Sequence, residues 1–211
     1  MFLSSILSGI FISIGCIINL FMLYNNQKLL GSIFFSIGLI LVFICQTKLF
    51  TGSIMDIFHV LNHKLKFIQM IKNWFIIYIG NFIGCVIMSI FIFYSKSFNN
   101  DMINIVNHII TLNIHKSFIT LIFLGILCNM LVCLSVYMNW KSKSLIEKIF
   151  IPILPITIFV FCGFQHSIAD MFYLSINLLY NNINFYLLIP VTIGNIIGGL
   201  FIGIILYFKH P

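Results

Sequence analysis

Charge is the scarcest feature of this sequence. Only 7% of its 211 residues are charged, arginine is missing and four side chains are acidic, whereas 61% of the residues are apolar and the mean hydropathy is +1.15. Soluble domains carry roughly a quarter of charged residues, so the composition excludes a soluble monomer. The 11 lysines give a formal net charge of +7 but cluster between apolar runs and form no single basic face, which excludes a nucleic-acid partner.

No cysteine pair has the spacing of a metal or disulfide site. All six cysteines lie inside apolar runs and none belongs to a CxxC motif: Cys16, Cys45, Cys85, Cys128, Cys133 and Cys162. Cysteines of this kind are small, buried thiols. We therefore expect six buried free thiols and no metal centre.

Six long apolar runs occupy most of the chain. Since a helix needs about 20 residues to cross a bilayer, six crossings leave only short connections and no separate soluble domain. The first run follows no basic segment and is long enough to span, which predicts a retained helix rather than a cleaved leader. The sequence predicts an all-α polytopic membrane protein, one domain over 1–211 with six transmembrane helices, at about residues 2–24, 29–50, 71–94, 117–140, 149–180 and 185–208.

The lysines between the runs are unevenly distributed. With the N-terminus inside, seven lysines lie in or beside the cytoplasmic connections and at the C-terminal end, and three lie on the opposite side, Lys28, Lys96 and Lys116. Cytoplasmic loops carry the excess of positive charge, so both termini are predicted to be cytoplasmic.

Two of the runs contain polar or flexible residues where hydrocarbon is expected. The second continues into residues 48–53 (KLFTGS), and residues 163–167 (GFQHS) interrupt the fifth. Non-helical backbone at membrane depth is tolerated only where protein or a water-filled cavity surrounds it. Two such breaks indicate a lined pathway through the membrane.

A short internal repeat accompanies the two breaks. Residues 78–84 (YIGNFIG) reappear as residues 192–198 (TIGNIIG), which places Asn195 114 residues after Asn81. Because three crossings separate equivalent positions, the two halves have opposite orientations. This predicts an inverted-topology repeat with halves at about 1–95 and 115–208.

These motifs resemble the formate/nitrite transporter family of bacterial anion channels, with the formate channels as the nearest group. Residues 49–52 (LFTG) are similar to the family's interrupted second helix, residues 163–169 (GFQHSIA) to its interrupted fifth, and residues 125–129 (GILCN) and 189–199 (IPVTIGNIIGG) to its fourth and sixth. The resemblance implies an aquaporin-like fold, a homopentamer in a bacterial cytoplasmic (inner) membrane, formate as the leading cargo, no cofactor and no enzymatic activity.

The resemblance also implies roles for individual residues. It places Thr51 and His166 at the centre of a pore, with Asn129 and Asn195 as polar neighbours. An ionisable residue within a span is itself a candidate functional residue, and His166 is the only histidine deep in a run. Two hydrophobic constrictions are expected on either side of this centre, formed by Phe35, Leu39, Leu49, Phe50 and Phe159.

A mechanism follows from the barriers that such a pore presents. A small anion must lose its hydration at the apolar constrictions, which a neutral molecule largely avoids. We hypothesise that outer lysines concentrate formate and that His166, oriented by Asn195 or Thr51, either transfers a proton to it or acts as a fixed cation.

Four positions depart from the charges that are usual in the family. Gln165 replaces a Glu, Asn113 a Lys, Lys48 an acidic residue and Asp170 an Asn. Lys116 is expected to supply part of the charge that Asn113 lacks. A lone charge in hydrocarbon costs roughly 2.5–3.5 kcal/mol, so we expect Lys48 and Asp170 to face water or polar protein and to compensate each other. The chain also begins just before its first span, without the amphipathic N-terminal helix that gates family members, which puts that mode of gating in question.

Several alternatives stay open at this level. Nitrite and hydrosulfide are the other candidate cargoes, and the altered charges also allow a homologue that does not conduct. A membrane enzyme or haem protein would need paired deep histidines, or a nucleophile with its base, and the chain has one deep histidine. His59 and His63 have a spacing that can hold a metal ion on one face of a helix, but we expect them to lie on a solvent-exposed face without a metal.

Overall fold

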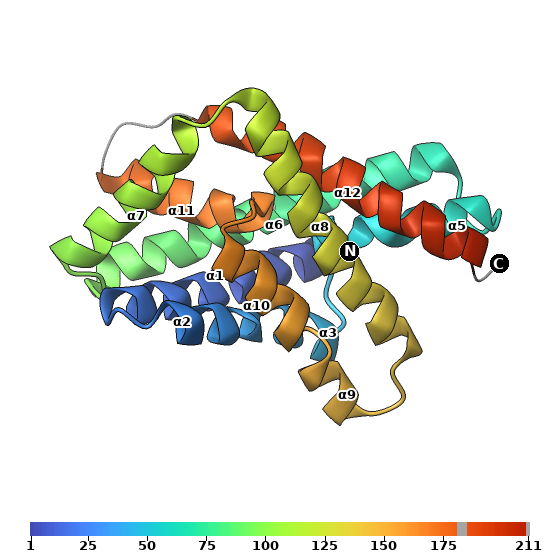
Figure 1. The fold of residues 1–211 in the computed structure, drawn as a ribbon, viewed down its shortest axis with the longest axis horizontal. Helices are drawn as coiled ribbons and strands as arrows, with labels where there is room; N and C mark the ends of the chain where they lie inside the picture. Colours follow the sequence, from blue (N-terminus) through green and yellow to red (C-terminus); the bar gives the residue numbers. More distant parts are fainter. Residues whose placement is uncertain (181–184, 210–211) are drawn as a thin grey trace.

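Helices make up every regular element in the residues that the structure, a computed structural model, describes, namely 1–180 and 185–209 (Figure 1). In chain order the elements are α1 (Phe2–Tyr24), α2 (Lys28–Phe35), α3 (Ile37–Ile44), α4 (Phe50–Ser53), η1 (Ile54–Asp56), α5 (Ile57–Leu61), α6 (Phe67–Ser95), α7 (Asn100–Ile114), α8 (Phe118–Lys141), α9 (Leu145–Phe150), α10 (Ile153–Cys162), α11 (Ser167–Tyr180), η2 (Phe185–Leu187) and α12 (Leu188–Lys209).

Much of this helical structure is apolar enough to cross a membrane. Over the described residues, five helical stretches have the length and hydropathy of a membrane span: Phe2–Tyr24, Phe67–Ser95, Phe118–Lys141, Leu145–Cys162 and Phe185–Lys209. Two shorter apolar segments, Lys28–Ile44 and Phe50–Leu61, accompany them. A multi-pass, all-helical membrane protein is therefore confirmed.

Both predicted interruptions are present. The first lies between the end of α3 at Ile44 and the start of α4 at Phe50, and the second between the end of α10 at Cys162 and the start of α11 at Ser167. At the second break Gly163 has a φ of +73°, a backbone conformation that glycine adopts without the steric cost of a Cβ. The second break falls on the residues that predicted it. The first lies at 45–49 and overlaps the predicted segment 48–53 only at Lys48 and Leu49, because Thr51, Gly52 and Ser53 are already helical in α4.

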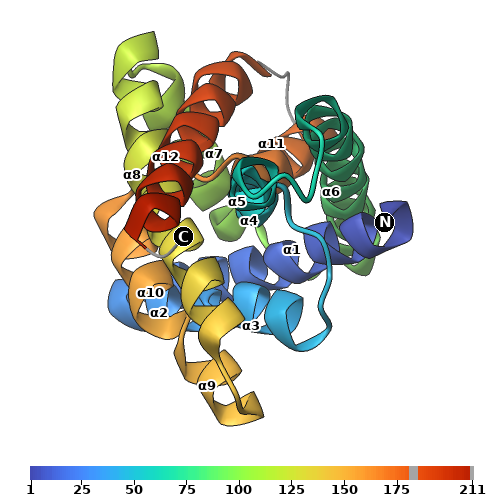
Figure 2. The same ribbon diagram turned by 90° about the vertical axis from the view of Figure 1, so that its right-hand side faces the viewer.

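Two crossed helix pairs form the frame of the molecule, α1 with α6 and α8 with α12 (Figure 2). Glycines line both crossings. A Cβ on Gly84 would collide with the carbonyl oxygen of Ile6, and a Cβ on Gly194 would collide with that of Ile122. The glycines at small-xxx-small spacing therefore permit close backbone approach. In Figure 2, α4 and α11 lie between the two pairs, at the middle of the molecule.

The helix α7 was not expected, because the segment between the third and fourth runs was taken as a connection. Its start is capped by Asn99, whose side-chain oxygen accepts the backbone N–H of Met102 at 2.9 Å. Met102, Val106 and Ile110 then recur on one face at four-residue spacing and are buried, where α7 packs against α1 and α11. The cap and the spacing were both visible in the sequence.

The cysteines are all free thiols, but the prediction that all six are buried is wrong for two of them. Cys45 and Cys162 are exposed, whereas the other four are buried. Both exposed residues lie at the ends of helices, Cys45 directly after α3 and Cys162 at the last position of α10. The apolar runs around Cys45 and Cys162 predicted burial, but in each run the helix ends at or just before the cysteine, where the break begins.

Candidate functional site

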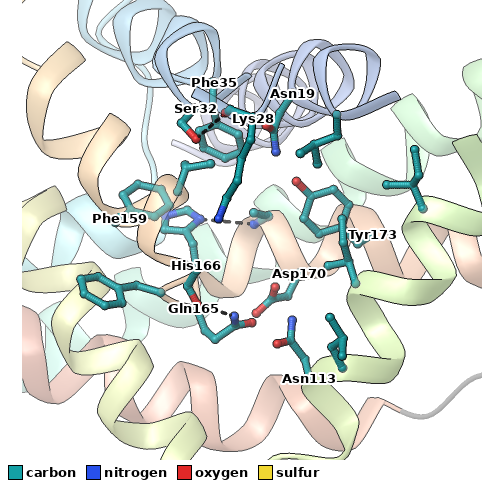
Figure 3. Close-up of a pocket in the computed structure, with 18 of the residues that line it drawn as sticks. Asn19, Lys28, Ser32, Phe35, Asn113, Phe159, Gln165, His166, Asp170 and Tyr173 are labelled. Carbon is teal, nitrogen blue, oxygen red and sulfur yellow. Dashed lines mark hydrogen bonds between the residues drawn. The ribbon is translucent and has the colours of Figure 1, made fainter. Parts of the chain in front are cut away.

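Three cavities follow one another through the middle of the bundle. The largest, which we name the vestibule, has a volume of about 550 Å³, and its polar lining consists of Asn19, Lys28, Ser32, His108, Asn113, Lys116, Gln165, His166, Asp170 and Tyr173 (Figure 3). The next is a gap of about 10 Å³ whose lining is apolar except for His166. The third, the inner cavity, has about 440 Å³ and includes Lys48, Asp56 and Lys148 in its lining.

Shared lining residues show where the cavities meet. Phe35 and Phe159 line both the vestibule and the gap, and their rings meet edge to face with centroids 5.7 Å apart. Leu39 and Leu49 line both the gap and the inner cavity. All four side chains are 3% exposed. A solute moving along the row of cavities would therefore shed its water at two apolar narrowings.

Phe50, the fifth residue assigned to a constriction, occupies a different place. It is not among the lining residues of the three cavities, and its ring packs against Tyr78 on α6 with centroids 4.8 Å apart. Since Phe50 opens α4 and Leu49 precedes it, side chains of consecutive residues point in different directions and only Leu49 faces the gap.

His166 lies where the vestibule and the gap meet, held by three contacts. Its Nε2 is 2.9 Å from Thr51 Oγ1, and its Nδ1 accepts the backbone N–H of Ala169 at 3.2 Å. The ring also stacks on Phe159, with 20° between the planes. Because an amide hydrogen points at Nδ1, this nitrogen carries a lone pair, and the proton of the neutral ring is on Nε2.

Asn195 acts on the backbone around His166 and not on its ring. Its Oδ1 accepts the N–H of Ser167, the first residue of α11, and its Nδ2 donates to the carbonyl oxygens of Gln165 and Gly125, each at 2.9 Å. A helix that begins inside the membrane leaves N–H groups without partners. Asn195 on α12 supplies a partner, so it fixes the chain on both sides of His166.

Asn81, which was identified in the sequence only as part of the repeated motif, bonds the backbone at the other break in the same way. Its Oδ1 accepts the N–H of Phe50, the first residue of α4, at 2.8 Å. Its Nδ2 donates to the carbonyl oxygens of Lys48 and Ser5 at 3.0 and 2.7 Å. The two asparagines of the repeated motif therefore make matching contacts.

Asn129 joins the two broken segments. Its Nδ2 donates to the carbonyl oxygen of Thr51 at 3.2 Å and to that of Asn195 at 2.6 Å. Thr51, Asn129 and Asn195 are fully buried, and none of them is among the lining residues of the three cavities. The structure thus brings all four residues of the predicted centre together, with only His166 facing open space.

The altered charges separate into two groups. Asn113, Gln165, Asp170 and Lys116 line the vestibule, where Lys116 Nζ donates to Asn113 Oδ1 at 2.7 Å. Partial burial lowers the pKa of Lys116, an effect that the nearby carboxyl of Asp170 opposes. Lys28 of α2 also lines the vestibule, so two cationic side chains face this cavity.

Lys48 lies in the inner cavity together with Asp56, on the other side of the gap from Asp170. The prediction that Lys48 and Asp170 compensate each other is therefore wrong, although each does line a cavity. The reason is that Lys48 lies in the segment between α3 and α4, which lines the inner cavity, whereas Asp170 lies in the first turn of α11, which lines the vestibule.

The site offers no metal centre in the described ranges. There, no group of three or more His, Cys, Asp or Glu side chains lies close enough to hold an ion. His59, one of the spaced pair, has its ring beside that of Trp140, with centroids 5.6 Å apart.

Sequence reasoning missed several residues of the vestibule. Asn19 and Tyr173 come from apolar runs, and Ser32 follows the start of the second run, so composition gave no sign of them. Their common feature is a polar side chain on the buried face of a helix, and that face is defined only by the packing of α1, α2 and α11.

The comparisons with known proteins agree with this geometry. Residues 1–209 match the family model described as formate/nitrite transporter. The chain belongs to the formate/nitrite transporter family. The resemblance found in the sequence is thereby confirmed, and the family assignment makes this a transport protein rather than an enzyme.

Relatives within the formate/nitrite transporter family share most of the chain. The formate channel FocA of Escherichia coli K12 is 32% identical over 94% of this chain and 81% of its own length, and the formate channel BtFdhC of Bacillus thuringiensis is 31% identical over 94% and 82%. A solved pentameric formate channel with formate bound is 32% identical, with a TM-score of 0.84 over 99% of this chain and 96% of that one. An FNT family ion channel, 23% identical, shares the fold with a TM-score of 0.92 over 100% and 90%.

Proposed function

We propose that this protein is a formate channel in which the cargo passes from the vestibule, through the gap beside His166, to the inner cavity. The observation that carries the proposal is the row of three cavities with apolar narrowings, at the middle of which His166 is held by Thr51. The relatives that are named formate channels support formate as the cargo.

The topology we propose has six crossings and an inverted repeat over about 1–95 and 115–208. α2 to α5 together form the second crossing and α9 to α11 the fifth, each broken at the centre. The matching contacts of Asn81 and Asn195 support equivalent halves. In this arrangement α4 and α11 both begin at the centre, where Asn81 and Asn195 accept the N–H groups of their first residues.

The setting we propose is a bacterial cytoplasmic (inner) membrane with both termini in the cytoplasm. The vestibule then opens on the outer side, since it is lined by Lys28 and Lys116, and the inner cavity opens toward the cytoplasm, where Lys148 lies.

The assembly we propose is a homopentamer in the lipid bilayer. Large apolar side chains are exposed on the outer faces of several helices, among them Phe75, Phe91 and Phe123, which are 61–68% exposed. An exposed apolar surface of this kind requires lipid or another copy of the chain. The relative solved as a pentamer favours contact between copies over part of it.

In the proposed mechanism His166 acts as a neutral hydrogen-bond donor. Protonation of Nδ1 would place its hydrogen against the N–H of Ala169, which disfavours a fixed cation. A neutral imidazole that keeps its Nε2 proton can donate to a carboxylic acid but does not protonate formate. We propose that the cargo crosses the narrowings as neutral formic acid, hydrogen-bonded at the gap to His166, whose ring Thr51 holds in place.

Flux into proteoliposomes tests this function. Formate uptake is expected to exceed lactate uptake and to rise as the external pH falls, because more cargo then enters as the neutral acid. His166→Asn is expected to lower formate flux about ten-fold or more, since a fixed donor at the gap is lost. His115→Asn, at an exposed position outside the cavities, is the matched control. Absence of formate flux from folded protein, or faster flux of nitrite, would contradict the proposal.

Lys116 gives a second test at the vestibule. Lys116→Gln is expected to raise the formate concentration for half-maximal flux several-fold and leave the maximal rate unchanged, since the charge attracts the anion without entering the gap. Because burial lowers the pKa of Lys116, its charge is lost at a lower pH than that of an ordinary lysine. The difference between wild type and variant should therefore shrink as the pH rises through this lowered pKa.

Lys96→Gln is the control, since Lys96 is exposed at the end of α6 and does not line the vestibule. If Lys116→Gln and Lys96→Gln reach half-maximal flux at the same formate concentration, the vestibule charge does not attract the cargo.

A further inference from the structure

Three side-chain oxygens around the vestibule are buried and have no hydrogen-bond partner in the described chain. They are Asp170 Oδ2, Gln165 Oε1 and Asn19 Oδ1, from residues that are 4%, 6% and 6% exposed. A buried polar atom that lacks a hydrogen-bond partner destabilises the folded state. All three atoms are hydrogen-bond acceptors, so this part of the cavity lacks a hydrogen-bond donor.

Gln165 and Asp170 are the two of these residues that flank His166. Gln165 Nε2 donates to the carbonyl oxygen of Gly163 at 2.9 Å, which fixes the amide so that Oε1 is the unpaired end. In Figure 3 the ends of the Gln165 and Asp170 side chains point toward the same part of the vestibule. A proton on Asp170 would turn one of two facing acceptors into a donor for the other.

Within the described residues, no ion pair keeps Asp170 charged. Lys116 Nζ, a cation in the same cavity lining, donates instead to Asn113 Oδ1, and Asp170 Oδ2 has no partner there. The other titratable groups that face this region are Lys28, His108, His166 and Tyr173 around the vestibule and, from the packed helices, Tyr78 and the thiols Cys16 and Cys128.

A role as a helix cap does not account for Asp170. Although it lies in the first turn of α11, the N–H of Ser167 is already bonded to Asn195 Oδ1 and that of Ala169 to His166 Nδ1. A buried, unpaired carboxylate is costly in a span, whereas a carboxylic acid needs only an acceptor, and Gln165 Oε1 is available.

We propose that Asp170 is held as a neutral carboxylic acid and donates its proton to formate in the vestibule, a step that rests on the function proposed above. The O–H bond of Asp170 breaks as an O–H bond forms on formate. The product is formic acid, which enters the gap, and an Asp170 carboxylate, which faces Lys116 until water from the outer side returns a proton. On the inner side formic acid releases its proton to water, so one proton crosses with each formate.

Donor and acceptor are both carboxylic acids, but a surrounding that keeps Asp170 neutral makes it the weaker acid, so the transfer to formate costs free energy. Entry of formic acid into the gap and return of a proton to Asp170 from water draw the transfer forward. The transfer also takes place before the Phe35 and Phe159 narrowing, which is where the charge of the anion would otherwise be most costly.

Infrared spectroscopy tests the protonation state directly, because the chain has only four acidic side chains. The wild type is expected to show the carbonyl band of a protonated carboxyl group at neutral pH, and Asp170→Asn is expected to lack it. Asp101→Asn, which alters an exposed acid at the start of α7, should keep the band. A wild type without the band overturns the proposal.

Transport separates this inference from the proposed function. In proteoliposomes loaded with a pH indicator, wild type should take up one proton with each formate. Asp170→Asn, whose amide can still donate to Gln165, should lower formate uptake at neutral pH at least about ten-fold, and Asp170→Glu should restore most of it. Formate flux in the wild type that is unchanged in Asp170→Asn overturns the role of Asp170 and leaves the function standing.

Two further outcomes are decisive. No formate flux in the folded wild type overturns the proposed function itself. Uptake by the wild type that depends on sodium and carries no proton overturns the inference, because the unpaired oxygens then serve a cation. If Asp170→Asn does not fold, the infrared band of the wild type and the flux of Asp170→Glu still decide the proposal: a missing band overturns it, and retained flux with a retained band supports it.

Discussion

Asn195→Leu is expected to destabilise the protein by at least about 3 kcal/mol. The side chain of Asn195 bonds three buried backbone groups, the N–H of Ser167 and the carbonyl oxygens of Gln165 and Gly125. Leucine has a similar volume but leaves each of these groups unpaired, at about 1–3 kcal/mol apiece. Unfolding in detergent, followed by circular dichroism against denaturant, would measure the loss.

The same measurement on two more variants makes the test specific. Asn81→Leu should be destabilised to a similar degree, because Asn81 makes matching bonds to Phe50, Lys48 and Ser5. Asn25→Leu removes one hydrogen bond at an exposed helix end and should have little effect. If Asn195→Leu is as stable as Asn25→Leu, the second break is held by contacts other than this amide.

Phe159→Ala is expected to abolish discrimination by size. The Phe159 ring closes the passage between the vestibule and the gap against Phe35 and also covers the ring of His166. Its removal leaves a wider and less hydrophobic passage, so we expect lactate flux to rise about ten-fold or more and to approach that of formate. Parallel uptake of labelled formate and lactate into proteoliposomes measures the ratio.

Phe91→Ala is the matched control for this variant. Phe91 is 63% exposed on the outer face of α6, so its loss changes the contact with lipid or another copy and not the passage. A formate to lactate ratio that is the same in wild type, Phe159→Ala and Phe91→Ala would mean that size selection occurs elsewhere.

The breaks were predictable because their residues are polar or flexible, whereas the runs around them are apolar. Residues 48–53 and 163–167 are the points where polar or flexible residues enter long apolar runs, and a continuous span gains nothing from them. The repeated Gly-Asn pairs at 80–81 and 194–195 were visible for the same reason. What these asparagines bond could not be read from their spacing, since the partners lie on other helices.

Lys48 and Asp170 show where sequence reasoning reaches its limit. Each was correctly expected to need a polar surrounding, since the cost of a bare charge in hydrocarbon is independent of the fold. Their pairing was wrong, because Lys48 lies before α4 in a segment that lines the inner cavity, whereas Asp170 lies in α11 along the vestibule. The prediction that Phe50 lines a constriction was wrong because its side chain points in a different direction from that of Leu49, the residue before it.

The sequence by itself determined that this chain is a multi-pass helical protein, where its helices are interrupted and to which family it belongs. These properties depend on composition and local pattern, which act through transfer from water to lipid and through backbone hydrogen bonding along the chain. Only the tertiary structure decided that His166 meets Thr51, that Asn195 holds the backbone beside it, and that Asp170 Oδ2 has no partner among the described residues. Those contacts join residues from 28 to 115 positions apart, or are missing, because packing of α1, α6, α8 and α12 fixes which side chains can reach one another.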